Sequence, residues 1–463
     1  MSVLDRRKDV IEAGSKAISP AMTVYGAAAT GAAIAALPLL GVICAISEKR
    51  RRTVFKRLIP SLSGLCPSAA KSLWIHALSV GEVLSSEPLI ERLQPCRYQH
   101  PVCMTAATLS GHQIAAERFN GRVDALGYFP FDVPFSIKRA FRRINPALVV
   151  LVESDIWPGF MAEAGQRGVP VVLANARLSE RSLKGYRRLA AVSRPMLRAM
   201  AHICCQSAED ADRFEALGVF PDRLSVTGSI KFDQAPPEMD DAARTSWRRR
   251  LGISAEAPVM LAASTHPGEE GTLLAAYDGA RRRVPGIRLI IAPRDPRRGE
   301  TLCQMAVRRN NAGILYSALE ASSAPAGAGV VVVDRMGVLA RLLALAQVAF
   351  IGGSLVPSGG HNPLEAAAHG VPVLLGPDMR DFQTTADWLV AGGGAVRVST
   401  ADDIAQQVEM LVTSDQGRRM GAAARGVFLR HRGAVARVMT VLDRVLAAET
   451  AGACGPSDAR KNE

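Results

Sequence analysis

The segment ALVVLVESDIWPGFMAEAGQRGVPVVLANA, residues 147–176, decides the fold class. A strand-like stretch at 147–154, apolar as far as Val152, precedes a helical stretch at 159–168, and a second strand-like stretch follows at 170–176. Short apolar runs that alternate with helical stretches are typical of parallel strands joined by crossover helices. The segment therefore predicts a strand–helix–strand unit of a parallel α/β sheet.

The same alternation continues on both sides of this segment and is interrupted once. It begins near Ser72, stops at the polar, proline-rich stretch 234–240 and restarts at 258. A chain of 463 residues also exceeds what one ordinary core holds. We therefore expect two Rossmann-like α/β domains that face each other across a cleft, with ligands at the carboxyl ends of the strands.

A candidate membrane anchor precedes the first domain. Residues 24–46 carry no charged side chain and would span about 35 Å as a helix, enough for a hydrocarbon core of about 30 Å. Basic residues follow at 49–52, so the positive-inside rule places the rest of the chain in the cytoplasm. The alternative is a buried, alanine-rich helix.

The predicted organisation then has six parts. In chain order they are an N-terminal extension (1–23), the candidate anchor (24–46), a first α/β domain (47–233), a linker (234–240), a second α/β domain (241–446) and a small, polar tail expected to be disordered (447–463).

Composition limits the partners. The formal net charge of +13 predicts an acidic partner, namely nucleic acid, an anionic membrane or a phosphorylated substrate. Aromatic residues make up only 5% of the chain, and no basic stretch is interleaved with them. Few side chains could therefore stack on nucleic-acid bases, which disfavours nucleic acid as the partner. The cysteines form no C-x-x-C pair and no zinc-type cluster with histidine, and scattered thiols fit a reducing cytosol.

Loops that follow strands of the first domain carry charged side chains. Glu82 enters a helix after a buried strand, where its alternative role is to complement the helix dipole. Glu153 and Asp155 follow the strand of the opening segment, and a helix N-cap at Asp155 is the alternative there. Lys231 lies just before the linker, where it could bind an anion or be an ordinary solvated lysine.

One loop of the second domain is rich in glycine. Two glycine pairs lie within residues 352–360, and Asn362, Pro363 and Glu365 then form the pattern of a helix start, with Asn362 as N-cap. Backbone N–H groups at such a start bind phosphate, although Glu365 could have a capping role alone. Neither a P-loop nor a G-x-G-x-x-G motif occurs, which disfavours an ATPase or an ordinary dehydrogenase.

Together these loops resemble one family, the Kdo transferases of lipopolysaccharide biosynthesis, which attach 3-deoxy-D-manno-oct-2-ulosonic acid (Kdo) to a lipid A precursor. The matching stretches are WIHALSVGEV, YFPFDVP, ESDIWP, LANARLSERS, GSIKFD, ASTHPGEE, APRDP and IGGSLVPSGGHNPLEAAAHGVPVLLGP, in that order between Trp74 and Phe382. The resemblance implies the GT-B glycosyltransferase architecture, in which the second domain binds the donor.

The resemblance also implies the roles of individual residues. Glu82 would be the general base that deprotonates the acceptor hydroxyl, while Glu153 and Lys231 would stabilise the transition state. CMP-Kdo would be bound by Pro293, Arg294, Met336, Gly337, Val338, Asn362, Pro363, Leu364 and Glu365. Transfer would proceed with inversion and would need no metal and no other cofactor.

The chain departs from the family pattern at a few of these positions. The usual ETELWPN is ESDIWPG here, which changes Asp155 and Gly159. Asp295 stands where a histidine is usual, and Val338 where a glutamate is common. The departures concern the details of donor binding rather than the reaction.

The implied partners are CMP-Kdo, a lipid A precursor such as lipid IVA and the anionic leaflet of the cell inner membrane, with the catalytic domains on the cytoplasmic side. Basic side chains that could contact these lipids, or merely solvate helix faces, are Arg50, Arg51, Arg52, Lys138, Arg139, Arg142 and Arg143. Two other functions were weighed. A sugar-nucleotide epimerase of the same architecture would need no anchor and no lipid acceptor, and a non-catalytic, membrane-anchored protein that binds nucleic acid would need more aromatic residues.

Overall fold

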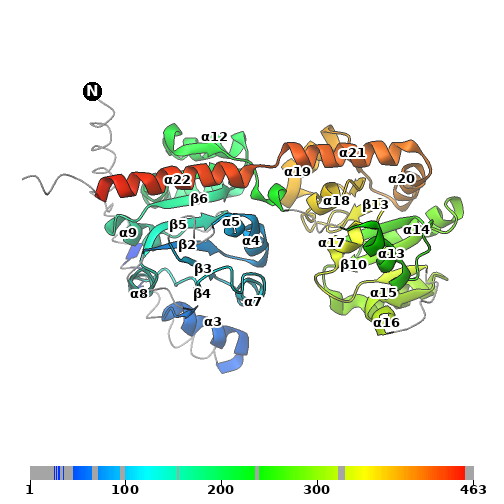
Figure 1. Cartoon of the computed structure of the whole chain (residues 1–463), viewed down its shortest axis with the longest axis horizontal. Helices are drawn as coiled ribbons and strands as arrows, with labels where there is room; N and C mark the ends of the chain where they lie inside the picture. The colour runs from blue at the N-terminus through cyan, green and yellow to red at the C-terminus, as the bar shows by residue number, and fades with distance from the viewer. Residues whose placement is uncertain are drawn as a thin grey trace, which may run out of the picture. The chain divides into compact units, whose positions relative to one another are not determined.

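The computed structural model describes residues 25–26, 28, 30–31, 35, 45–64, 71–93, 100–153, 156–234, 239–321 and 329–453. The chain divides into two compact α/β units (Figure 1). The first unit comprises the chain up to Gln234 together with the part from Arg432 onward, and the second comprises Ala235 to His431.

The first unit is built on an eight-stranded sheet with the order β1-β4-β3-β2-β5-β6-β7-β8. Its strands are β1 (Leu62–Gly64), β2 (Ser72–Ala77), β3 (Val102–Ala106), β4 (Ala125–Tyr128), β5 (Pro146–Val152), β6 (Val171–Ala176), β7 (His202–Cys205) and β8 (Leu224–Val226). Neighbouring strands pair in parallel, except that β1 pairs antiparallel with β4. The prediction of a parallel α/β sheet is confirmed.

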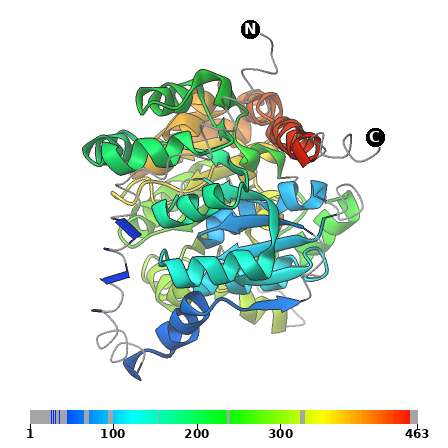
Figure 2. The same cartoon turned by 90° about the vertical axis from the view of Figure 1, so that its left-hand side faces the viewer.

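Helices cover both faces of this sheet (Figures 1 and 2). They are α4 (Val80–Ser85), α5 (Glu87–Arg92), α7 (Leu109–Arg118), α8 (Pro134–Ile144), α9 (Pro158–Gln166), α10 (Glu180–Arg188), α11 (Ala190–Arg198), α12 (Ala208–Ala216) and α22 (Ala434–Ala453), with α3 (Glu48–Leu58) before the first strand and short 3₁₀ turns η1 (Pro221–Arg223) and η2 (Ile230–Asp233) near the linker. A parallel sheet covered on both faces needs continuous apolar strands, and β5 is buried at every position.

Alternate residues of β2 pack into the hydrophobic core on opposite faces of the sheet. Trp74 packs on one face, where its ring lies edge-on to Phe141 and Phe160 with centroid distances of 5.2 and 5.1 Å. Leu73 and Ile75 pack on the other face. Because Trp74 is fully buried, replacing it with alanine should cost about 3–5 kcal/mol.

The second unit has a seven-stranded sheet with the order β11-β12-β10-β9-β13-β14-β15, and its strands are all parallel. The strands are β9 (Val259–Thr265), β10 (Arg288–Pro293), β11 (Gly313–Leu315), β12 (Val330–Val332), β13 (Val348–Ile351), β14 (Val373–Leu375) and β15 (Ala395–Arg397). Its helices are α13 (Asp241–Arg250), α14 (Glu270–Arg283), α15 (Gly299–Arg308), α16 (Tyr316–Ala321), α17 (Leu339–Leu343), α18 (Leu364–Ala368), α19 (Gln383–Ala391), α20 (Ala401–Thr413) and α21 (Asp415–Arg430), with 3₁₀ turns η3 (Pro296–Arg298) and η4 (Arg380–Phe382).

Each sheet has a topological switch point at which successive connections run in opposite directions. In the first unit β2 and β5 are neighbours, while β3 lies beyond β2 and β6 lies beyond β5. In the second unit β9 and β13 are neighbours in the same way, between β10 and β14. Loops that follow such strand pairs diverge and leave room for a ligand, so the loops after β2, β5, β9 and β13 are the first places to look for a site.

The C-terminal helix α22 corrects the predicted domain boundary. Its apolar residues Val438, Leu442 and Leu446 recur at helical spacing and are buried in the core of the first unit. Asp233 accepts hydrogen bonds from the N–H groups of Gly433 and Val435, at 2.5 and 2.6 Å, and so fixes the start of the helix. The prediction that the second domain extends to residue 446 is therefore wrong, because α22 buries its apolar face on the first sheet.

The ends of the chain differ from expectation in one further respect. Helix α22 continues to Ala453, so the first residues of the predicted tail 447–463 are helical. The rest of that tail, the extension 1–23 and most of the candidate anchor 24–46 lie outside the described residues. Among the residues that the structure does describe, no helix is both long and apolar enough to cross a membrane.

The cysteines only partly follow the expectation of scattered thiols. Cys204, Cys205 and Cys303 are free. Cys103 is disulfide-bonded, so the expectation is wrong for that residue.

Candidate active site

Glu82 lies in the first turn of α4, directly after β2. One carboxylate oxygen accepts the N–H of Leu78 at 2.5 Å, and the other lies 3.5 Å from the hydroxyl of Ser79. The half-buried side chain is therefore held in one orientation by the chain that leads into its own helix. A carboxylate in the first turn fits the alternative of complementing the helix dipole, and the same contacts fix a carboxylate at the carboxyl edge of the sheet, where a base would be needed.

Glu153 and Lys231 form an ion pair at the same edge. Lys231 Nζ lies 2.7 Å from Glu153 Oε1, and the two side chains are only 24% and 20% exposed. Glu153 follows β5 with a left-handed backbone, φ 69°, which a non-glycine residue adopts at an energetic cost and which is common at functional sites. The structure thus brings together two of the three predicted catalytic residues.

Asn175 joins this pair, although the sequence analysis gave it no role. It lies near the end of β6, is fully buried and also has a left-handed backbone, φ 57°. Its amide nitrogen donates to Glu153 Oε1 at 3.3 Å, and its amide oxygen accepts the N–H of Ile230 at 3.1 Å. The signal that could have found it is the asparagine of LANARLSERS at the end of a strand, because asparagine tolerates the left-handed region.

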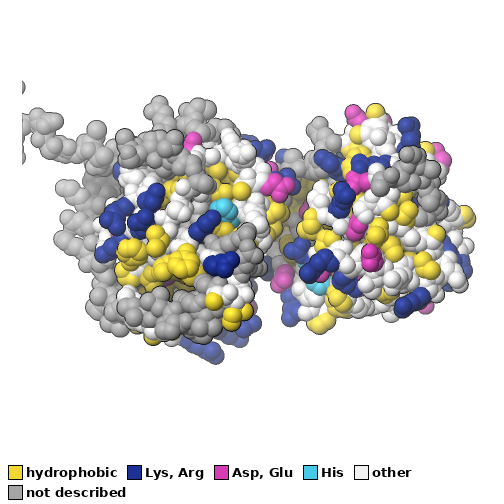
Figure 3. Space-filling model, turned by 90° about the horizontal axis from the view of Figure 1, so that it is seen from below, with side chains coloured by type: hydrophobic (Ala, Val, Ile, Leu, Met, Phe, Trp, Pro, Cys, Tyr) yellow, Lys and Arg dark blue, Asp and Glu magenta, His cyan; other side chains and the backbone are white. Residues whose placement is uncertain are grey.

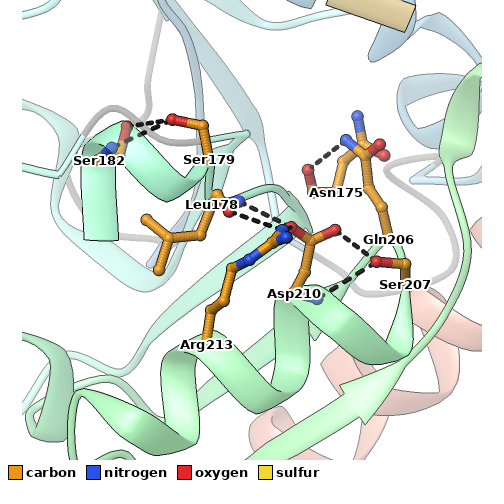
Figure 4. Close-up of polar contacts among 8 residues, drawn as sticks. All are labelled: Asn175, Leu178, Ser179, Ser182, Gln206, Ser207, Asp210 and Arg213. Carbon is orange, nitrogen blue, oxygen red and sulfur yellow. Dashed lines mark hydrogen bonds and ion pairs between the residues drawn. The ribbon is translucent and has the colours of Figure 1, made fainter. Parts of the chain in front are cut away.

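The loop that follows Asn175 is fastened to the start of α12 (Figure 4). Buried Asp210 accepts the N–H of Leu178 and the hydroxyl of Ser207, both at 2.9 Å. Gln206 donates to the backbone oxygen of Asn175, also at 2.9 Å. The backbone is therefore held at Asn175 itself and again at Leu178.

The start of α9 differs from the alternative weighed for Asp155. The helix begins at Pro158 with Trp157 as N-cap, and Asp155 itself lies outside the described residues. The carboxylate that caps this helix is Asp132, which accepts the N–H groups of Gly159 and Phe160 at 2.9 and 2.8 Å. The N-cap position of this helix is thus Trp157.

In the second unit, Glu269 occupies the N–H groups of the glycine-rich loop after β13. Its carboxylate accepts the N–H groups of Gly353, Ser354 and Leu355 at 2.7, 2.9 and 2.9 Å. It also accepts the N–H of His266, in the loop after β9, at 2.8 Å. Glu269 is fully buried, so a protein carboxylate already fills the place that the first glycine pair offers to an anion.

The second glycine pair is also engaged. Gly359 donates its N–H to Asp378 at 2.9 Å, and Gly360 donates its N–H to the oxygen of Gly353 at 2.9 Å. Both have left-handed backbones, φ 87° and 72°, which explains the glycines without a ligand. The N–H groups of Gly353, Gly359 and Gly360 are therefore already bonded within the protein, and an anion at this loop would have to use the helix start that follows.

The helix start after this loop also differs slightly from expectation. Helix α18 begins at Leu364, with Pro363 rather than Asn362 as N-cap. The Asn362 side chain accepts the N–H of Leu364 at 3.1 Å, and Glu365 lies exposed in the first turn. The helix has only five residues, so its dipole is a weak source of anion affinity.

Two histidines meet at the switch point of this unit. His266 Nε2 and His361 Nε2 lie 2.8 Å apart, so one ring nitrogen donates and the other accepts. Burial lowers the pKa of His361 to about 4, with smaller contributions from His266 and Arg294. His361 is therefore uncharged at neutral pH.

The remaining predicted donor residues follow β10 and β12. Arg294 is exposed directly after β10, where its N–H is bonded to the oxygen of Thr265 at 2.9 Å. Met336 is 67% exposed, and Gly337 has a left-handed backbone, φ 85°. Asp295, one of the departures from the family pattern, caps η3 and pairs with Arg297 at 2.8 Å.

Nothing in the described part of the chain resembles a metal centre, since no three His, Cys, Asp or Glu side chains gather there closely enough to hold an ion. The positive charge is also dispersed. On the face shown in Figure 3, Lys and Arg side chains are spread over both units, with acidic side chains among those of the second.

Comparison with known proteins identifies the family. Residues 49–234 match the family model described as 3-deoxy-D-manno-octulosonic-acid transferase (kdotransferase). The chain is 32% identical over 412 residues to the 3-deoxy-D-manno-octulosonic acid transferase of Haemophilus influenzae, covering 88% of this chain and 94% of that protein. The chain belongs to the Kdo transferase family. The enzyme of the same name from Bordetella pertussis is also 32% identical, over 81% of this chain and 87% of its own.

Solved structures show that the chain shares its fold with enzymes that act on nucleotide sugars. A putative UDP-N-acetylglucosamine 2-epimerase from Listeria monocytogenes has a TM-score of 0.58, covers 82% of this chain and 98% of its own, and is 13% identical. The UDP-GlcNAc 2-epimerase from Neisseria meningitidis has a TM-score of 0.56, covers 81% of this chain and all of its own, and is also 13% identical. At this identity the likeness shows the two-unit, GT-B-like fold alone.

The comparisons also rank the functions weighed from the sequence. The epimerases share the fold, whereas the Kdo transferases share about a third of the residues along most of the chain. The predicted family is confirmed. The epimerase alternative accounts for the shared fold but not for the sequence identity to Kdo transferases.

Proposed function

We propose that this protein transfers Kdo from CMP-Kdo to a lipid A precursor of the lipid IVA type and releases CMP. The observation that carries the proposal is the 32% identity to a named Kdo transferase along both units. Family membership makes the chain a glycosyltransferase of lipopolysaccharide biosynthesis, and the donor, the acceptor and the residue roles below are proposed on that basis.

Glu82 is proposed as the base that removes the proton from the acceptor hydroxyl. A general base must have a carboxylate in a defined place within hydrogen-bond reach of that proton. The bond from the Leu78 N–H supplies such an orientation, since it holds Oε2 and leaves Oε1 turned towards the Ser79 hydroxyl at 3.5 Å. In an inverting transfer one base is enough, because the acceptor attacks once from the face opposite the leaving phosphate.

Glu153 and Lys231 are proposed to stabilise the transition state. Negative charge grows on the departing phosphate while positive charge develops on the sugar carbon, so a fixed pair of opposite charges can serve both. Each side chain of the pair is only about one-fifth exposed. Because less water screens these charges, their field is stronger than that of a fully exposed pair.

The donor is proposed to bind the second unit at Pro293 and Arg294, at residues 336–338 and at residues 362–365. These groups follow β10, β12 and β13, so they share the carboxyl edge of one parallel sheet, the usual place for a nucleotide. Because Glu269 occupies the N–H groups of Gly353, Ser354 and Leu355, the exposed cation Arg294 is the better partner for the phosphate. We propose no metal and no other cofactor.

The membrane part of the proposal concerns residues 24–46 as a single-pass anchor in the cell inner membrane, with both units on the cytoplasmic side. Basic side chains follow this stretch in α3 (EKRRRTVFKRL), and α8 adds Lys138, Arg139, Arg142 and Arg143. Such charges favour an anionic leaflet and a phosphorylated lipid acceptor. A chain that starts at Lys49 should leave the membrane fraction, and equal partition of both forms into the soluble fraction would rule out the anchor.

The function is tested with the purified full-length protein, CMP-Kdo and lipid IVA. CMP release should depend on the lipid, and mass spectrometry should show the lipid heavier by one or more Kdo units. Incubation with UDP-N-acetylglucosamine tests the epimerase alternative. Epimerisation of that sugar without CMP release from CMP-Kdo would replace the proposed function.

A further inference from the structure

The geometry points to Asn175 as the positioning residue that sets the Glu153–Lys231 ion pair, an inference that rests on the proposed function of this pair. Asn175 bonds to Glu153 of this pair and to the backbone next to Lys231. It donates to Glu153 Oε1 at 3.3 Å, the same oxygen that lies 2.7 Å from Lys231 Nζ. It also accepts the N–H of Ile230, the residue before Lys231, at 3.1 Å.

The chemistry of the three groups allows only one orientation of the amide. A carboxylate oxygen can only accept here and a backbone N–H can only donate, so the NH₂ group of Asn175 must face Glu153 and its oxygen must face Ile230. No other side chain of this size offers a donor and an acceptor in one plane. Aspartate would place an oxygen against the Glu153 carboxylate. Leucine would leave the N–H of Ile230 without its acceptor and would remove one of the two donors to Glu153 Oε1.

The backbone of Asn175 is built for this task. The pairing of β6 with β7 shifts register between Leu173 and Ala176, which places Asn175 in a bulge, and a bulge re-aims the side chain that it carries. Its left-handed φ of 57° is accessible to asparagine and glycine but costly for most residues.

The surroundings keep that backbone from relaxing. Gln206 donates to the backbone oxygen of Asn175, and Asp210 accepts the N–H of Leu178 three residues on (Figure 4). Asn175 is fully buried and Asp210 is only 5% exposed. The β6 loop is thus a rigid support for one amide, and that amide joins the end of β5 to the start of η2.

The test uses Asn175→Gly in the full-length enzyme, because glycine accepts the left-handed backbone and removes only the amide. Asn145→Gly is the matched control. Asn145 also has a left-handed backbone, φ 47°, and lies exposed at the end of α8. Asn175→Asp, which keeps the size of the side chain, is the second variant and decides the matter if the glycine variant does not fold.

Asn175→Gly should lower kcat by about 10–100-fold, because misplacing a reacting group by about 1 Å costs that much, while the KM for CMP-Kdo stays within about twofold. Asn175→Asp should lower kcat at least as much, and Asn145→Gly should leave it unchanged. Normal kcat in a folded Asn175 variant, or an equal loss in Asn145→Gly, would overturn the inference.

A second measurement does not depend on turnover. Acetylation of Lys231 by an N-hydroxysuccinimide ester, followed by peptide mass spectrometry with exposed Lys184 as internal reference, reports how firmly the ion pair is held. Asn175→Gly should speed labelling of Lys231 by about threefold or more, because both ends of the pair lose an anchor. If the wild type releases no CMP, the proposed function fails while this arm still decides the role of Asn175, and unchanged labelling would refute that role.

Discussion

The switch points of the two units use the same kind of side chain for opposite purposes. In the first unit the carboxylate of Glu153 is partly exposed and pairs with Lys231, another side chain. In the second unit the carboxylate of Glu269 is fully buried and binds four backbone N–H groups. A carboxylate that is satisfied by backbone holds loops together, whereas one that is balanced by a partly exposed lysine keeps a charge available.

The difference teaches how to read loops at such places. The glycine-rich loop of the second unit looks like a phosphate cradle in sequence, yet Glu269 and Asp378 already use the N–H groups of its glycines. The charged loops of the first unit look like ordinary solvated turns, yet they converge on one ion pair. Chemistry is therefore expected to depend more steeply on the first unit, and folding more steeply on Glu269.

The steepest chemical effect is expected at Glu82. Glu82→Gln keeps the shape of the side chain and removes its basicity, so transfer should slow at least about a hundredfold if Glu82 is the base. The protein should stay folded and still bind CMP-Kdo. Glu87→Gln, a few residues away in α5 and paired with Arg122 at 3.1 Å, is the control and should transfer normally. Near-normal transfer by Glu82→Gln would leave Glu82 with the role of complementing the helix dipole and move the base to another residue.

The contrast itself is tested by making the same change in both units. Glu269→Gln presents an NH₂ group to backbone donors and should cost about 2–4 kcal/mol locally. Glu153→Gln should cost much less stability and lower kcat instead. Hydrogen exchange measured by mass spectrometry reads the two units separately, and peptides that cover residues 350–360 should lose protection only in Glu269→Gln. Equal protection in both variants would contradict the contrast.

The sequence predicted much of the fold because the fold depends on local patterns. Continuous apolar runs became β2, β5, β6, β9 and β13, with both faces buried as such runs require. The positions of Glu82, Glu153 and Lys231 could be predicted in the same way, because each lies within a few residues of the end of a strand.

What the sequence did not reveal depends on contacts between distant residues. Asn175 and Ile230 meet across 55 positions, and Glu269 and Gly353 across 84. Helix α22 follows the second unit in sequence but packs on the first, where Asp233 caps it across 200 positions. No local period distinguishes these partners from the many other polar residues of the chain, so only the folded structure identifies them.

A smaller effect concerns donor binding in the second unit. Arg294→Ala and Asn362→Ala should each weaken CMP binding by about tenfold, the share of one charge-assisted hydrogen bond, while acceptor binding stays intact. Arg297→Ala is the matched control, because Arg297 lies close by, is 89% exposed and is already paired with Asp295. Calorimetric titration with CMP separates the variants. Unchanged affinity in both Arg294→Ala and Asn362→Ala would show that these residues do not bind the nucleotide.

The smallest expected effect is a pH dependence of the second unit. The pKa of His361 lies at about 4 when folded, because burial disfavours the charged ring, whereas the pKa of an unfolded histidine is about 6.5. Between these values the unfolded chain binds more protons, so this contribution to stability is complete above about pH 6.5 and is lost as the pH falls towards 4. Because the ring is not fully buried, the contribution should be on the order of 1 kcal/mol.

Protection of residues 350–360 in hydrogen exchange, corrected for the intrinsic rate at each pH, should fall between pH 6.5 and 4.5. His361→Gln, which cannot take up that proton, should show a shallower fall. His202 in the first unit also has a lowered pKa, again chiefly through burial, so His202→Gln is the control that should leave this loop unchanged. An equal fall in His361→Gln and the wild type would mean that the contact between His266 and His361 does not control the loop, and would leave Glu269 as its main support.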